Sequence, residues 1–256
     1  MSATAYKAPA LGMGLKLINA LSEASSPQGL SELARRVGTN KNMATRLLST
    51  LQVEGWVEML EPGPRYRLTL KPFAILSKTL GAMPLTELAH EPLKELWESC
   101  GQSAYLGVLN GVNVMYFMHF DAVGPVKIAG RVGGEYPLHC SAPGKALLAY
   151  SDCKLFEYLA SRGFKKHGPN SICEASSLSK ELERVKANGF ATDNEEFGRG
   201  IVCVAAPVFD RFGQVAGTAG ISATTIDFSL EELVKAHSGK VVACAQKISS
   251  SLGFER

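Results

Sequence analysis

Apolar residues recur at intervals of three and four along 17–24, 30–37 and 44–51. This spacing places them on one face of a helix, so each stretch predicts a short amphipathic helix. Three residues, Gly38, Thr39 and Asn40, join the second predicted helix to the third. Glycine suits the left-handed position after a helix, and asparagine suits the cap before the next one. Two short helices joined in this way are typical of a helix-turn-helix, which limits what this part of the chain can fold into.

The outer face of the third predicted helix is polar and basic. Its side chains carry hydrogen-bonding groups of the kind that reach base edges and phosphates: Lys41, Asn42, Thr45, Arg46 and Ser49. Arg35 and Arg36 end the preceding helix, where they can contact a phosphate backbone. The second helix of a helix-turn-helix enters the major groove. The pattern therefore favours a DNA-binding unit over a small domain with an ordinary charged surface.

A basic hairpin follows these helices. Residues 56–60 (WVEML) and 65–69 (RYRLT) predict two short strands around a Pro-Gly-Pro turn. Arg65 and Arg67 share one face of the second strand because side chains alternate along a strand. The hairpin reads as the wing of a winged helix-turn-helix, with its arginines directed at phosphate or at the minor groove.

Charge and composition support a DNA-binding arm on a neutral body. Residues 1–72 carry nine Lys and Arg against five Asp and Glu, whereas residues 73–256 carry 18 against 19. A chain of 256 residues is long enough for two domains. It has neither an apolar run of the ~18–20 residues that a membrane helix needs nor a secretory signal at its start. Six scattered cysteines without a CxxC pair favour reduced thiols, and we expect a cytoplasmic protein.

The middle of the chain changes from helical to strand-like patterns. Residues 70–83 and 85–100 predict helices, and Pro92 is expected to kink or divide the second one. Further strands are predicted at 103–110, 112–119, 126–130, 190–193, 200–210 and 214–222. Further helices are predicted at 141–150, 178–189 and 230–252. Helices packed on an antiparallel sheet give an α+β body.

Several stretches, in this order and spacing, resemble the IclR family of bacterial transcriptional regulators. They are 29–57, YRLT (66–69), PLHCSAPGKALLA (137–149), ATDNEEFGRGIVCVAAPVFD (191–210) and ISSSLG (248–253). The resemblance implies a two-domain α+β fold: a winged helix-turn-helix at 1–71, a linker helix at 72–83, and a GAF-like antiparallel sheet with flanking helices at 84–256. It also implies operator DNA as a partner, homodimers that pair into tetramers, and a small organic acid or aromatic metabolite as effector.

The resemblance further implies an effector pocket. Its residues in this chain are Ala142, Pro143, Gly144, Asp193, Cys203, Gly220 and Ser222. Pro143 stands where some relatives offer a backbone N–H, and Gly220 stands where relatives can carry a serine. We expect the N–H groups of Gly144 and Lys145, at the start of a helix, to hold a carboxylate oxygen. Asp193 has two readings, as the cap of a turn or as a ligand-binding group facing the cavity.

Two alternatives to a regulator were weighed. A thiol enzyme would need Cys203 as nucleophile with His139 and Asp193, but a cysteine in an apolar strand is more often a small buried hydrophobe. A metabolite sensor without DNA binding would not explain the basic third helix. The Walker A, HExxH and GxSxG motifs are absent, and His139–Cys140 alone reads as a structural pair. We therefore expect a ligand-responsive repressor of a metabolic or catabolic operon, with no enzyme activity, cofactor, metal or membrane contact.

Overall fold

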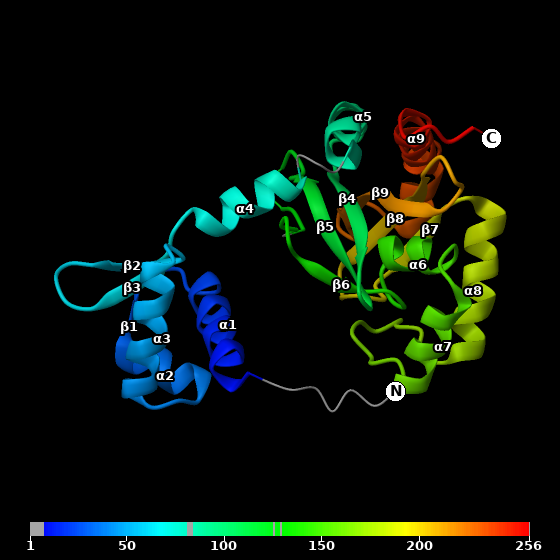
Figure 1. The fold of residues 1–256 in the computed structure, drawn as a ribbon. Helices are drawn as coiled ribbons and strands as arrows, with labels where there is room; N and C mark the ends of the chain where they lie inside the picture. Colours follow the sequence, from blue (N-terminus) through cyan, green and yellow to red (C-terminus); the bar gives the residue numbers. More distant parts are fainter. Residues whose placement is uncertain (1–7, 81–83, 125, 129, 256) are drawn as a thin grey trace. The chain divides into compact units, whose positions relative to one another are not determined.

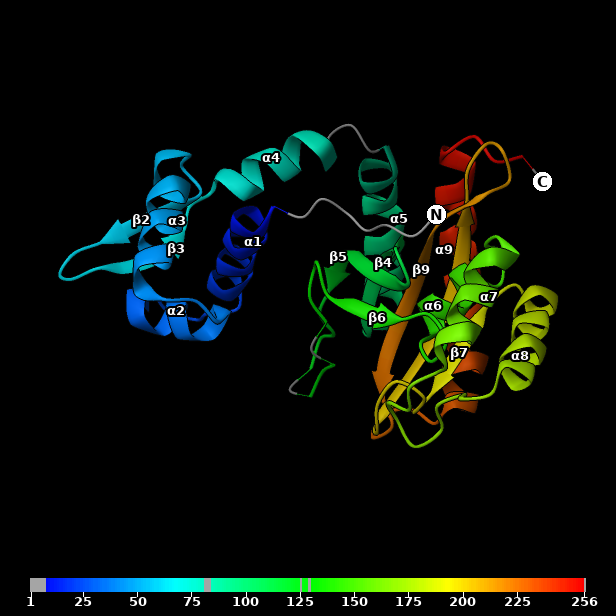
Figure 2. The ribbon, with the colours of Figure 1, turned by 60° about the horizontal axis from the view of Figure 1, so that its bottom comes forward.

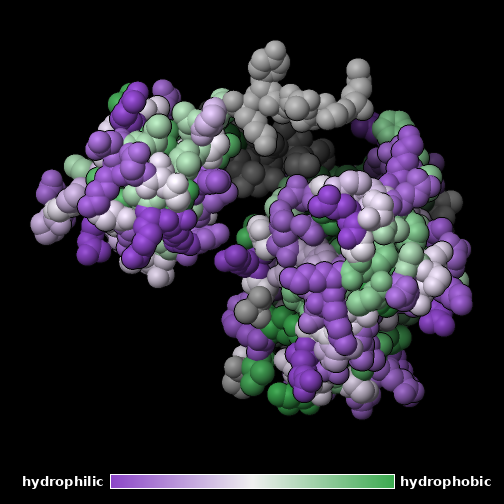
Figure 3. Space-filling model, turned by 90° about the horizontal axis from the view of Figure 1, so that it is seen from below, coloured by the Kyte–Doolittle hydropathy of each residue, from purple (hydrophilic) through white to green (hydrophobic). Residues whose placement is uncertain are grey.

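The computed structural model describes residues 8–80, 84–124, 126–128 and 130–255. The chain divides into two compact units between Ala82 and Met83 (Figure 1). No helix among the described residues is both long and apolar enough to cross a membrane. On the face drawn in Figure 3, hydrophilic side chains cover most of both units, and hydrophobic ones gather in separate patches.

The first unit is a three-helix bundle with a small sheet. Its elements are α1 (Pro9–Ser22), β1 (Gln28–Gly29), α2 (Leu30–Val37), α3 (Lys41–Val53), β2 (Val57–Leu60), β3 (Arg65–Leu68) and α4 (Lys71–Leu80). Leu17, Leu33 and Leu48 are fully buried where the first three helices meet. Gly38 ends α2 with φ 73°, and the Asn40 side chain accepts the N–H of Met43 at 2.8 Å to cap α3. The predicted helix-turn-helix and wing are confirmed, and the two-residue β1 adds an edge to the wing.

The second unit is an antiparallel sheet of six strands in the order β6-β5-β4-β9-β8-β7. Its strands are β4 (Ser103–Asn110), β5 (Asn113–Phe120), β6 (Glu135–Pro137), β7 (Ala191–Asn194), β8 (Ile201–Phe209) and β9 (Val215–Thr224). Its helices are α5 (Pro84–Cys100), α6 (Ala142–Leu148), α7 (Cys153–Arg162), α8 (Ala175–Asn188) and α9 (Leu230–Ser251). This architecture confirms the predicted α+β fold.

Each face of the sheet has its own core, because side chains alternate along the strands. On β8, Val202 and Val204 pack in the core formed with α5 and α9. Cys203 and Ala205, which point the other way, pack in the core formed with α6 and α8. Figure 2 shows these two helix layers on opposite sides of the sheet. The second face carries the candidate effector site.

Three details differ from the sequence expectations. Among its described residues, 126–130 forms no strand, and the short β6 pairs with β5 instead. Ile128 and Gly130 of this segment line a cavity. α5 is not divided at Pro92, since buried Leu93 and Leu96 hold it in the core beside α9. α7 was not expected from the sequence; it has no fully buried residue, and its Leu155, Phe156 and Leu159 pack only partly buried against the core.

Candidate functional site

The predicted reading face of α3 is exposed. Ala44 and Leu48 are fully buried on the inner side of the helix. The opposite side presents the five predicted DNA-contacting residues to solvent: Lys41, Asn42, Thr45, Arg46 and Ser49. The Thr45 hydroxyl donates to the Lys41 carbonyl at 2.9 Å, so its oxygen remains an acceptor directed along the helix surface. The helix can therefore present hydrogen-bonding groups to base edges without disturbing the core.

The other predicted arginines differ in what they contact. Arg36 donates to the Ala20 carbonyl at 2.9 Å and pairs with Glu23 at 2.5 Å, so it braces the end of α1. Arg67 of the wing pairs with Glu58 on the neighbouring strand at 2.6 Å. Arg65 reaches the Pro27 carbonyl at 3.4 Å. Arg35 is exposed at the end of α2. Arg36 has a structural role that the sequence did not indicate.

A cavity of about 390 Å³ lies on the α6 side of the large sheet. It is lined by Tyr116, His119, Lys127, Ile128, Gly130, Tyr136, Ser141, Pro143, Asp193, Phe197, Ile201, Cys203 and Ser222. Pro143, Asp193, Cys203 and Ser222 were predicted as effector-binding residues, and the structure brings them together here. Ala142, Gly144 and Gly220 were also predicted but do not line this cavity.

Three of the lining residues form a row across neighbouring strands. Asp193 of β7 lies opposite Cys203 of β8, which lies opposite Ser222 of β9. The Cys203 Sγ and Ser222 Oγ atoms are 3.2 Å apart. Burial raises the pKa of the Cys203 thiol well above its usual value, so the thiol stays protonated. A protonated thiol is a weak nucleophile, which fits a cavity wall better than a catalytic group.

The expectation for the start of α6 is wrong. The Gly144 N–H donates to the Ser141 side chain at 3.2 Å, and the Lys145 N–H donates to the Ser141 carbonyl at 2.9 Å. Neither group is therefore available to a carboxylate, because the serine cap already satisfies both. Gly144 has a packing role instead. A Cβ at this position would lie 2.5 Å from the Leu138 Cα and 2.6 Å from the Pro137 carbonyl oxygen.

Gly220 also has a packing role. A Cβ at Gly220 would lie 2.5 Å from the Tyr105 Oη. The Tyr105 ring stacks on Tyr116 with centroids 4.4 Å apart, and Tyr116 contacts Tyr136 at 4.3 Å. Tyr105 thus takes the space that a serine at position 220 would need. In place of that serine, the chain has an aromatic wall along one side of the cavity.

Asp193 caps a turn and also faces the cavity, so its predicted role in ligand binding stays a prediction. Its Oδ1 accepts the backbone N–H of Glu196 at 2.7 Å and that of Phe197 at 3.4 Å, so it caps the turn after β7. It also lines the cavity and is 1% exposed. Burial, reinforced by the nearby charge of Glu196, raises the pKa of Asp193 to about 7. This carboxyl can therefore change its charge near neutral pH.

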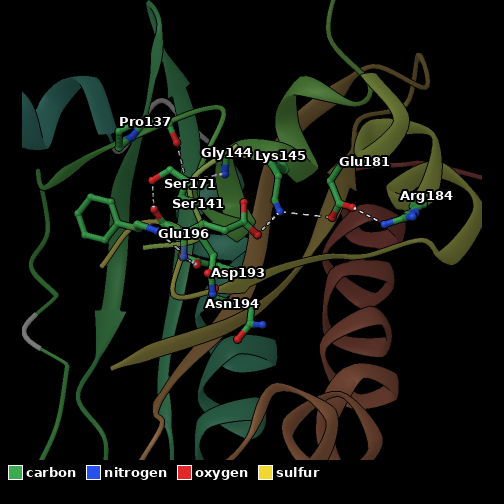
Figure 4. A network of polar contacts seen from close by, with 12 residues as sticks. Pro137, Ser141, Gly144, Lys145, Ser171, Glu181, Arg184, Asp193, Asn194 and Glu196 are labelled. Atoms are coloured by element: carbon green, nitrogen blue, oxygen red, sulfur yellow. Dashed lines mark hydrogen bonds and ion pairs between the residues drawn. The ribbon is translucent and has the colours of Figure 1, made fainter. Parts of the chain in front are cut away.

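A buried ion pair supports the same turn. The Lys145 Nζ lies 2.5 Å from Glu196 Oε1 and 3.3 Å from Glu181 Oε1, and Lys145 is completely buried (Figure 4). Arg184 extends the network to the surface, 3.5 Å from Glu181. The pair joins α6 and α8 to the turn that Asp193 caps. Our sequence analysis missed it, although a lysine inside an otherwise apolar helix indicates a buried charge that needs a partner.

His119 and Lys127 are two charged or titratable lining residues that the sequence did not identify. The His119 side chain is 7% exposed, and its Nδ1 lies 3.4 Å from Asp121 Oδ1. Lys127 forms an ion pair with the same carboxylate. Burial lowers the pKa of His119, so the ring is mainly neutral at pH 7. Lys127 is thus the one formally positive side chain among the described residues that line the cavity.

Comparisons with known proteins place the chain in a family. The model described as "Bacterial transcriptional regulator IclR C-terminal" matches residues 77–250, and the IclR helix-turn-helix domain matches residues 10–60. The chain belongs to the IclR family. It is a DNA-binding transcriptional regulator with an effector-type second domain. The coarse function expected from the sequence is confirmed.

Individual IclR-family proteins cover nearly the whole chain. The HTH-type transcriptional regulator KdgR of Escherichia coli K12 is 32% identical over 227 residues, which are 88% of this chain and 86% of KdgR. A crystal structure of an IclR regulator from Alicyclobacillus acidocaldarius shares 27% identity and a TM-score of 0.82, covering 97% of this chain and all of that one.

A third comparison is with an IclR homologue from Microbacterium hydrocarbonoxydans, whose crystal structure is complexed with 4-hydroxybenzoate. It has a TM-score of 0.85 and covers 95% of this chain and 99% of that one. Its sequence is 19% identical, so the likeness shows a shared fold.

Proposed function

We propose that this IclR-family regulator represses a metabolic or catabolic operon in the bacterial cytoplasm and that a small carboxylate with an apolar or aromatic body modulates it. The observation that carries the effector class is the cavity itself. Its lining combines one lysine, Lys127, with an aromatic wall made by Tyr116, Tyr136 and Phe197. The bound 4-hydroxybenzoate of the Microbacterium homologue belongs to the same chemical class.

The same proposal assigns a role to each part of the chain. Residues 1–71 bind DNA, residues 72–83 act as a linker helix, and residues 84–256 bind the effector. The division of the chain between Ala82 and Met83 lies one residue before the proposed start of the effector-binding domain and supports that limit. α4 (Lys71–Leu80) accounts for most of the linker. An effector regulates only if it prefers one arrangement of the DNA-binding heads over another.

Arg46→Ala is expected to weaken operator binding by about 1–3 kcal/mol, because it removes a donor fork that reads guanine or clamps phosphate. The fold is expected to be unchanged, since Arg46 is exposed opposite buried Leu48. Fluorescence anisotropy on the DNA upstream of the protein's own gene measures the loss. Arg162→Ala, an exposed arginine on α7, is the matched control. If the Arg46→Ala variant bound the operator with wild-type affinity, the assignment of this face of α3 to DNA reading would be refuted.

The oligomeric state of the protein is expected to determine the arrangement of its operator sequence. One winged helix offers too few contacts for nanomolar specificity, so two heads are expected to read a pseudo-palindrome. Leu11 and Leu15 of α1 are 65% and 53% exposed, and they supply apolar surface for pairing. Light scattering is expected to give the mass of a dimer or a tetramer. A monomer at micromolar concentration, bound to a single half-site, would contradict this proposal.

Lys127→Gln is expected to weaken carboxylate binding at least about tenfold, because it removes the positive charge from the cavity lining. Affinity for DNA without effector is expected to stay unchanged. Calorimetry with a panel of small aromatic carboxylates, 4-hydroxybenzoate among them, measures the change. Lys180→Gln, an exposed lysine on α8, is the control for a general charge effect. Equal losses in both variants would show that net charge alone is responsible.

A further inference from the structure

Two histidines and a cysteine outside the effector cavity come together in the second unit. The ligand-type atoms of His139, Cys140 and His167 all lie within 4.8 Å of one another. His139 and Cys140 are buried just before α6, and His167 is exposed in the loop between α7 and α8. The first two were read from the sequence as a structural pair, and only the fold adds His167 to them.

We propose that His139, Cys140 and His167 bind a divalent transition-metal ion of the zinc class. Two imidazole nitrogens and one thiolate are a ligand set that zinc accepts, and soft sulfur disfavours magnesium or calcium. Three protein ligands leave one tetrahedral position for water. None of the three residues lines the effector cavity, so the metal site is separate from the proposed carboxylate site.

The orientation of His139 is that of a metal ligand held by a neighbouring carbonyl. Its Nε2 lies 2.9 Å from the Lys165 carbonyl oxygen. When Nε2–H donates to this carbonyl, the Nδ1 lone pair is left for the metal. Ligating histidines almost always anchor their second nitrogen in this way. The same hydrogen bond fixes His139 to the loop that carries His167.

The separations allow coordination after a small adjustment. Zinc lies ~2.0–2.3 Å from nitrogen and sulfur ligands, so tetrahedral ligand atoms are about 3.5 Å apart. Closing from 4.8 Å requires movement of about an ångström. His167 is exposed, so its side chain has room to move toward the other two ligands. Cys140 binds as the thiolate, and its proton passes to the buffer, so one thiol proton is released for each ion bound.

A metal ion bound by these three residues would stabilise the wall of the effector cavity. The loop carrying His167 is bonded to the turn after β7: Gly168 N–H donates to the Glu196 carbonyl at 2.8 Å, and the Ser171 hydroxyl donates to the same oxygen at 2.6 Å. The His167 ring also stacks on Phe197, which lines the cavity, with centroids 6.0 Å apart. The ion would tie this loop to the segment that starts α6.

The test uses the untagged, metal-free full chain under reducing conditions. Cobalt(II) titration is expected to give one equivalent bound with a thiolate-to-cobalt charge-transfer absorption, and zinc is expected to displace the cobalt. Cys140→Ser is expected to abolish that absorption. His167→Ala is expected to weaken zinc binding at least about tenfold, measured by competition with a chromophoric chelator. His167 is exposed, so this variant is expected to fold.

Cys153→Ser, an exposed thiol on α7 outside the group, is the matched control and is expected to bind metal like the wild type. The proposal is overturned if the wild-type chain gives no thiolate–cobalt absorption. It is equally overturned if that absorption persists in Cys140→Ser or if the Cys153 variant loses it to the same extent. Unchanged zinc affinity in His167→Ala would also overturn the three-residue site.

Discussion

Lys145→Met is expected to lower the free energy of unfolding of the second domain by about 3–5 kcal/mol. Lys145 is completely buried and lies 2.5 Å from Glu196, which is itself 6% exposed. Methionine keeps most of the volume but leaves the Glu196 carboxylate without its cation. Breaking a buried pair from one side is costly because an uncompensated charge stays in the interior. Thermal or urea unfolding of the full chain measures the loss.

The double variant Lys145→Met/Glu196→Gln is expected to recover much of this stability, because it removes both charges together. Arg184→Ala is the control at the exposed end of the same network. Arg184 is 77% exposed, so its loss is expected to cost less than about 1 kcal/mol. If Lys145→Met were no more destabilising than Arg184→Ala, the buried pair would not support the turn at Asp193.

The DNA-binding unit was predictable because its signals are local. The spacing of Ala44 and Leu48 defines the inner face of α3, and the outer face follows from the same 3.6-residue period. Gly38 and Asn40 mark the turn by their own backbone and capping chemistry. The ion pair of Arg36 was not predictable because its partner, Glu23, follows a different helix, α1. No spacing rule reveals such a contact.

The effector site was predictable only in part, because some of its residues have no local sequence signal. The resemblance to the IclR family implied Asp193, Cys203 and Ser222, and the structure places them on three neighbouring strands, in the wall of one cavity. Lys127 lies in a segment without regular structure, and no periodicity links it to that face. The error at Gly144 came from counting helix N–H groups without assigning their partners. The Ser141 side chain caps α6 and already accepts the Gly144 N–H that was expected to bind the ligand.

Asp193→Ala is expected to abolish the response to the effector while leaving DNA binding without effector intact. The residue lies in the cavity wall, remote in sequence from the helix-turn-helix, and its Oδ1 holds the turn that carries Phe197. Calorimetry of carboxylate binding and anisotropy of operator binding measure the two effects separately. Ser161→Ala, an exposed residue of α7, is a control for substitution in the same domain. Equal carboxylate binding to wild type and to Asp193→Ala would remove the basis for the pocket.

Asp193→Asn separates the charge of this side chain from its shape. The pKa of Asp193 is raised from 3.8 to about 7, so the folded protein holds a proton there that the unfolded chain releases. Ionisation therefore costs stability, progressively between pH 3.8 and 7 and fully above pH 7. The asparagine variant does not ionise. Its stability relative to wild type is expected to rise over that range and to level off above pH 7.

The protonation of Asp193 is also expected to govern the affinity of the protein for its effector. Ionised Asp193 repels a carboxylate in the cavity, whereas its protonated form can donate a hydrogen bond, so wild-type binding is expected to weaken as pH rises through about 7. Protonation of His119 strengthens anion binding only at lower pH, because burial lowers the pKa of that ring. Asp193→Asn is expected to lose the dependence near pH 7 and to keep that of His119. A wild-type affinity that is constant between pH 6 and 8 would show that Asp193 does not change its charge there.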